Sequence, residues 1–175
     1  INRALEINPN HAEAINNLGF FLRESGDFDA SIEKYTQAIK IKPDFAEAYG
    51  NMGIAHKDKG ELDLAIKNLS RALEIDPNLP DFHNSAGLVF RDIGDVEAAL
   101  KSYQQVIRLD PDHKMAHWNQ CLAYLTKGDF EKGWPKYDWR WKANEDMKGT
   151  YISTSKPIWN HGRGQRVLLW AEQGI

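Results

Sequence analysis

The sequence predicts an all-α protein, a solenoid of stacked helix pairs, with a short C-terminal β-strand segment. Two columns of residues, each with a period of 34, predict the repeat. Prolines form one column, at Pro9, Pro43, Pro77 and Pro111. Glycines form the other, at Gly26, Gly60, Gly94 and Gly128, and each of them is followed by an acidic and then an apolar residue. A fixed period of this length is typical of arrays in which each unit buries its apolar face against its neighbours.

Each repeat contains two amphipathic helices, because its apolar residues recur at three- and four-residue spacing. Gly26 can end the first helix in a left-handed conformation, and Asp27 can accept hydrogen bonds from the first N–H groups of the second. Pro43 ends the second helix, since it has no N–H to donate. Helices are therefore expected at 12–24, 28–40, 46–59, 62–74, 81–93, 96–108, 114–127 and 130–142, the last one irregular around Pro135.

The same columns divide the chain into repeats and flanking segments. Residues 1–11 are expected to be the end of an earlier repeat, and the chain, which begins with Ile1, to be part of a longer protein. Full repeats are expected at 12–45, 46–79 and 80–113, a divergent repeat or cap at 114–146, and a linker leading into another domain at 147–175.

Composition excludes several classes of function. The 22 Lys and Arg residues against 25 Asp and Glu residues leave a net charge of −3, which argues against nucleic acid and membrane surfaces as partners. The single cysteine, Cys121, cannot form an intrachain disulfide, so a cytoplasmic location is expected.

The repeat resembles a known family in its small and aromatic columns. Gly19, Tyr35, Ala38 and Pro43 recur in register, and this pattern is similar to the tetratricopeptide repeat over residues 12 to about 142. The resemblance implies a right-handed superhelix with the first helix of each pair on the concave face, and it implies a partner protein or peptide held there.

A column of amides is the first candidate for binding that partner. It consists of Asn17, Asn51, Ser85 and Asn119. Asparagine is a poor helix former, so its recurrence inside helices needs a reason. One interpretation is a hydrogen bond within or between repeats. The other is a ladder of amides for the backbone of an extended peptide, which looks like the asparagine ladder of O-linked N-acetylglucosamine transferases.

A basic row of Arg23, Lys57 and Arg91 follows the same face, next to an acidic row of Glu24, Asp58 and Asp92. A solvated surface explains both rows as well as a groove of mixed charge does. Repeats that clamp chaperone C-termini present an asparagine at an inner position that Phe20, Ile54, Leu88 and Leu122 fill here, which disfavours that ligand.

No catalytic motif occurs in the repeats. Cys121 lies in the column of Gly19, Gly53 and Gly87 and is interpreted as a packing residue. His113 and His117 have the spacing of a metal pair, but His113 comes before its helix is established, which disfavours a zinc site.

The C-terminal third differs in composition, since it holds all six tryptophans. Some of these can cap the solenoid. The apolar run 167–171, bounded by Gly164 and Gly174, predicts a buried strand. The segments 133–141 and 168–174, with Trp159, resemble bacterial proteins that join tetratricopeptide repeats to a heptosyltransferase-like glycosyltransferase domain. This resemblance implies that Glu172, Gln173 and Gly174 begin a loop toward a sugar site.

Three functions follow from these observations. The preferred one is a protein- or peptide-binding scaffold that recruits partners to a larger bacterial sugar transferase. The second is the transferase itself, with a nucleotide sugar as cofactor of the full-length protein. In that case this chain holds no catalytic residue and no cofactor, because its last residues cannot build a nucleotide-sugar pocket. The third is a non-catalytic adaptor with a degenerate C-terminal domain.

Overall fold

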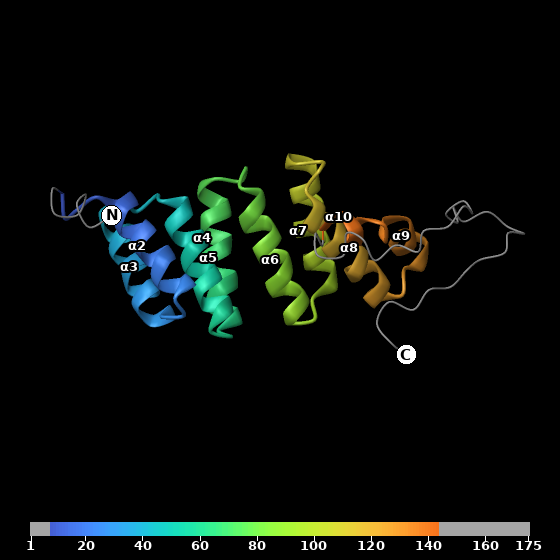
Figure 1. Cartoon of the computed structure of the whole chain (residues 1–175), viewed down its shortest axis with the longest axis horizontal. Coiled ribbons are helices and arrows are strands. Elements are labelled where there is room, and N and C mark those ends of the chain that lie inside the picture. Colours follow the sequence, from blue (N-terminus) through green and yellow to red (C-terminus); the bar gives the residue numbers. More distant parts are fainter. Residues whose placement is uncertain (1–7, 144–175) are drawn as a thin grey trace, which may run out of the picture.

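The computed structural model describes residues 8–143 and arranges them as a row of helix pairs (Figure 1). The first helices of the pairs are α2 (Ala12–Glu24), α4 (Ala46–Asp58), α6 (Pro80–Asp92) and α8 (Lys114–Lys127). The second helices are α3 (Phe28–Ile41), α5 (Leu62–Ile75) and α7 (Val96–Leu109). After α8 the chain forms α9 (Phe130–Gly133), the 3₁₀-helix η1 (Trp134–Lys136) and α10 (Trp139–Ala143).

The turn inside each pair follows the chemistry of the repeated Gly-acid dipeptide. Gly26, Gly60, Gly94 and Gly128 have φ between 81° and 85°. This left-handed conformation carries little penalty for a residue without a Cβ. The carboxylates of Asp27, Asp95 and Asp129 accept hydrogen bonds from the N–H groups three residues on. The predicted capping is confirmed at these three turns, whereas Glu61 makes no such bond and contacts His56 instead.

Glycine also permits the close crossing of the two helices in a pair. A Cβ on Gly19 would lie 2.7 Å from the Tyr35 ring, and one on Gly87 would lie 2.4 Å from the Tyr103 ring. Both tyrosine side chains are fully buried. The predicted packing of a small column against an aromatic column is therefore confirmed.

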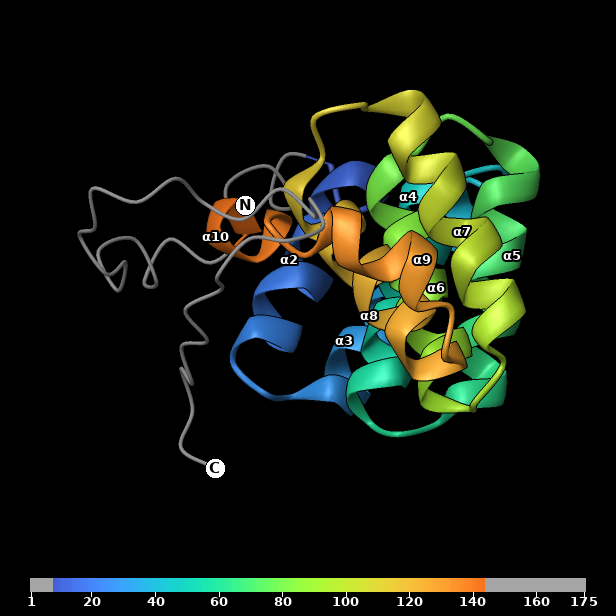
Figure 2. The same cartoon turned by 90° about the vertical axis from the view of Figure 1, so that its right-hand side faces the viewer.

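The first helices form the inner layer of the row. α2 contacts α4, α4 contacts α6 and α6 contacts α8, whereas the second helices do not contact one another to a comparable extent. In the end-on view, α5 and α7 lie along the edge of the row that is opposite α2 (Figure 2). Residues on the exposed sides of α2, α4, α6 and α8 therefore share one continuous face.

The predicted single helix at 130–142 is wrong. The segment is divided into α9, η1 and α10 because Pro135 lacks the N–H that a continuous α-helix needs. These three pieces pack on α8, with the Trp118 and Tyr137 ring centroids 5.6 Å apart.

The structure holds no strand within residues 8–143. The strand expected at 167–171 lies outside the described residues, as do residues 1–7 and the linker after Ala143. None of the helices from α2 to α10 is long and apolar enough to cross a membrane.

Candidate functional site

The predicted amide column does not form one uniform ladder. Asn17 is exposed, whereas Asn51 donates to Oδ1 of Asn16 at 3.1 Å. Asn119 donates in the same way to Oδ1 of Asn84 at 3.2 Å. Two amide bridges thus join α2 to α4 and α6 to α8, which is the inter-repeat hydrogen bond that the sequence left as one interpretation.

Ser85 behaves differently from the asparagines of its column. Its hydroxyl donates to the backbone carbonyl of Asp81 in its own helix, at 2.9 Å. Ser85 therefore makes no bridge to α4, and the position equivalent to Asn16 and Asn84 on α4 is Gly50. The junction between α4 and α6 lacks the polar link that its two neighbours have.

The basic and acidic rows neutralise each other. Arg23 contacts the carboxylates of Glu24 at 2.5 Å and Asp58 at 3.5 Å, so it links α2 to α4. Lys57 pairs with Asp58 at 3.0 Å. Arg91 pairs with Asp92 at 2.8 Å. The groove therefore has no unbalanced positive surface along this row.

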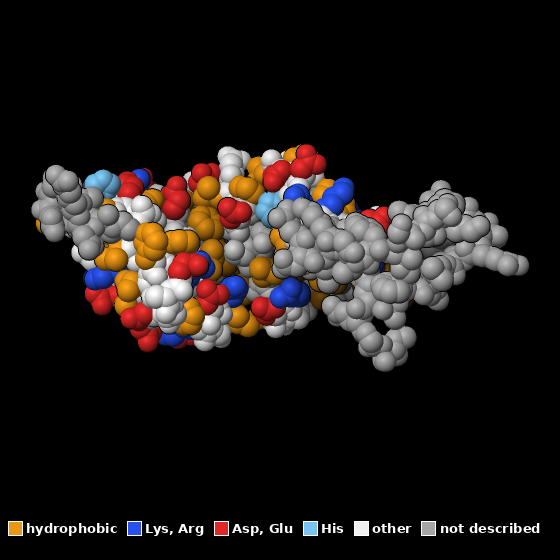
Figure 3. All heavy atoms as spheres, viewed as in Figure 1, with side chains coloured by type: hydrophobic (Ala, Val, Ile, Leu, Met, Phe, Trp, Pro, Cys, Tyr) orange, Lys and Arg blue, Asp and Glu red, His pale blue; other side chains and the backbone are white. Residues whose placement is uncertain are grey.

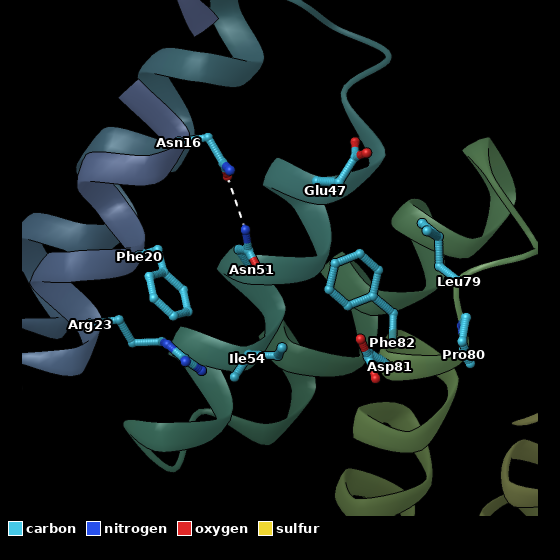
Figure 4. Close-up of a pocket in the computed structure, with 10 residues that line it drawn as sticks. All are labelled: Asn16, Phe20, Arg23, Glu47, Asn51, Ile54, Leu79, Pro80, Asp81 and Phe82. Carbon is cyan, nitrogen blue, oxygen red and sulfur yellow. Dashed lines mark hydrogen bonds between the residues drawn. The ribbon is translucent and has the colours of Figure 1, made fainter. Parts of the chain in front are cut away.

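A pocket of about 380 Å³ opens on the inner layer, between α2, α4 and the start of α6 (Figure 4). Its apolar lining comes from Phe20, Ile54, Leu79, Pro80 and Phe82, and its polar lining from Asn16, Arg23, Glu47, Asn51 and Asp81. Phe20 is 41% exposed, a high value for a large apolar side chain. Hydrophobic and acidic side chains lie next to each other on this face (Figure 3).

The apolar lining depends on a large residue in one column, Phe82, and on the absence of a side chain in another column, at Gly50. Phe82 stands where the other repeats have Ala14, Ala48 and Ala116, and its ring lies over Gly50. A Cβ on Gly50 would lie 2.4 Å from that ring. Sequence reasoning did not identify Gly50 or Phe82, although the aromatic residue in an alanine column was a usable signal.

Two carboxylates at the edge of the pocket were also missed by sequence reasoning. Glu47 and Asp81 are each the second residue of their helix and both are exposed. Glu47 has no ion-pair partner within the described part of the chain. Asp81 has only His113, at 3.9 Å.

The cysteine and the two histidines that were candidates for chemistry take part in packing and capping contacts. Cys121 is fully buried, its thiol donates to the Gly133 carbonyl at 3.4 Å, and burial raises the pKa of the thiol to about 11. The predicted packing role of Cys121 is confirmed. His113 caps α8 through Nδ1, while His117 stacks on Trp139 with ring centroids 3.9 Å apart.

No group of three or more metal-ligating side chains occurs between residues 8 and 143. Glu172, Gln173 and Gly174, the expected start of a sugar-site loop, lie outside the described residues.

Comparison with known families agrees with the 34-residue pattern. The family model described as "TPR repeat" matches residues 21–60, 55–92 and 87–128, and a second model, "Tetratricopeptide repeat", matches residues 1–33. The chain belongs to the tetratricopeptide repeat family. The resemblance inferred from the sequence is thereby confirmed. No curated protein matches the chain significantly.

Solved structures share the same fold. The chain is similar to a crystal structure of MamA, with 26% identity and a TM-score of 0.73 over 86% of this chain and 87% of that chain. It is also similar to a mutant O-GlcNAc transferase from Thermobaculum terrenum, with 30% identity and a TM-score of 0.61. That match covers 65% of this chain and 22% of the transferase, and thus a minor part of the enzyme. The first TPR of Spaghetti (RPAP3), bound to an HSP90 peptide, shares the fold at 18% identity and a TM-score of 0.65, over 67% of this chain and 93% of that one.

Proposed function

We propose that this chain is a protein- or peptide-binding module that holds an extended segment of a partner along α2, α4, α6 and α8. The pocket between α2, α4 and α6 carries the proposal, because a concave apolar site of about 380 Å³ with a few polar groups is typical of ligand pockets. The half-exposed Phe20 ring at this site gains free energy if a partner covers it.

The amide column contributes unequally to binding in this proposal. Asn17 is exposed and keeps its whole amide for a partner. Asn51 and Asn119 each donate one N–H to the amide of the neighbouring repeat, which leaves a second N–H and the Oδ1 acceptor without a partner in that bridge. Ser85 retains only its acceptor, since its O–H is used within its own helix. Asn119 is only 4% exposed, so a partner backbone would meet its best donors at Asn17 and Asn51.

The basic row has no free positive charge, so it can bind a partner carboxylate only by giving up an ion pair that it already makes. Arg23, Lys57 and Arg91 are held by neighbouring carboxylates in weak, partly exposed ion pairs. A carboxylate of the partner could replace one of these contacts at little net gain. We therefore expect the basic row to influence where the partner segment lies along the groove more than how tightly it binds.

Two adjacent phenylalanines provide the test. Phe20 lines the pocket, whereas Phe21 is more exposed, at 57%, and does not line it. Peptides selected on an array would be titrated against the wild type, Phe20→Ala and Phe21→Ala by calorimetry. Loss of half-buried aromatic contact should weaken binding about tenfold in Phe20→Ala and leave Phe21→Ala near the wild type. Equal affinities for the two variants, or the absence of any selected peptide, would contradict the proposal.

The larger context belongs to the same proposal. The likeness to the O-GlcNAc transferase and the C-terminal motifs support a recruiting role in a longer bacterial sugar transferase that uses a nucleotide sugar. The test is to delete residues 8–143 from the longer protein. Loss of sugar transfer to a protein acceptor, with transfer to a minimal acceptor retained, would support this role. A longer protein that binds peptides but transfers no sugar would instead favour a non-catalytic adaptor.

A further inference from the structure

The junction between α4 and α6 is the one place within residues 8–143 where neighbouring first helices could bridge through this amide column and do not. The junctions on either side are closed by the pairs Asn16–Asn51 and Asn84–Asn119. Here Gly50 and Ser85 replace the two amides, and the Phe82 ring occupies the space above Gly50. An apolar side chain of a partner can therefore be buried at this junction without breaking an amide pair.

The charge around the pocket favours a cation on the partner. Arg23, the cation of the lining, already has two carboxylate partners. Glu47 has none among the described residues, and Asp81 has only the distant His113. Glu47 and Asp81 are each the second residue of a first helix and both line the pocket, where Figure 4 shows their carboxylates on opposite sides of the Phe82 ring. The unmatched charge at this site is negative.

We propose that this pocket selects peptides in which a large apolar side chain stands beside a lysine or arginine. The apolar side chain lies against Phe20, Ile54 and Phe82, and the cation pairs with the carboxylate of Glu47 or with that of Asp81. The inference rests on the proposed function, since it requires that the inner face binds peptides. It adds a sequence preference that apolar burial alone does not produce.

The test uses short synthetic peptides on a Gly-Ser background, each with one central Leu, Phe or Trp. A neighbouring position carries Lys, Gln or Glu, and binding is measured by fluorescence anisotropy. The double variant Glu47→Gln/Asp81→Asn removes the negative charge without changing side-chain size. Asp63→Asn is the matched control, because Asp63 is also the exposed second residue of a helix but belongs to α5, a second helix.

The wild type should bind Lys peptides about three- to tenfold more tightly than the Glu peptides, as expected for exposed ion pairs. Glu47→Gln/Asp81→Asn should abolish this ratio, and Asp63→Asn should preserve it. Equal binding of the Lys, Gln and Glu peptides would overturn the selectivity and leave the proposed function standing. A lysine preference that survives in Glu47→Gln/Asp81→Asn would place the cation elsewhere and also overturn the inference. If no peptide binds, the inference and the proposed function both fail.

Discussion

The packing of Phe82 over Gly50 can be tested by a double-mutant cycle. Gly50→Ala places a Cβ 2.4 Å from the ring of a side chain that is 8% exposed and belongs to the core cluster with Leu69 and Val89. Overpacking of this kind costs about 1–3 kcal/mol. Alanine gains about 1 kcal/mol over glycine as a helix former. The free energy of unfolding should therefore fall by about 0–2 kcal/mol.

The same substitution should have the opposite sign when the ring is absent. Phe82→Ala alone should cost about 3–5 kcal/mol, as expected for truncation of a buried phenylalanine. In that background the methyl group that Gly50→Ala adds meets no ring, and only the advantage of alanine as a helix former, about 1 kcal/mol, remains. The coupling energy between the two sites should thus be about 1–3 kcal/mol, equal to the overpacking that Phe82 causes.

Urea denaturation followed by far-UV circular dichroism measures these free energies. The data should be fitted with a nearest-neighbour scheme, because stacked repeats need not unfold in one step. Gly26→Ala combined with Phe82→Ala is the control, since a Cβ on Gly26 would contact nothing within 4 Å. This control pair should be additive within about 0.5 kcal/mol. If Gly50→Ala had the same effect with and without the ring, the contact would not be the reason for glycine at this position.

Two further predictions concern buried titratable groups. Because burial raises the pKa of Cys121 to about 11, a thiol reagent at neutral pH should modify it slowly in the folded protein and rapidly in urea, and equal rates would contradict the burial. Burial also raises the pKa values of Tyr35 and Tyr103 from 10.0 to about 12, so the folded state keeps protons that the unfolded state loses. Their contribution to stability should be complete below pH 10 and should be lost as the pH rises to about 12. Urea denaturation across that range should show a smaller loss in Tyr103→Phe, and an unchanged loss would assign the effect to other groups.

The sequence alone predicted the features that depend on local chemistry. Gly26 with its positive φ and Asp27 with its capping bond act within one turn, so their residue types suffice to indicate the structure. The period of 34 then repeats that local result along the chain. The packing of Cys121 was predicted from the repeat itself, because the equivalent positions in the other repeats are glycines.

The tertiary structure decided how neighbouring first helices meet. Equivalent positions in the repeats are 34 residues apart in the sequence. The amides that form hydrogen bonds are 35 residues apart, as in Asn16–Asn51 and Asn84–Asn119. The stagger of two packed helices sets this offset, and no single repeat contains it. The same holds for Phe82 over Gly50, where a large residue in one column fits only because another column loses its side chain. The pocket therefore follows from the contact between repeats, which the sequence of each repeat by itself does not specify.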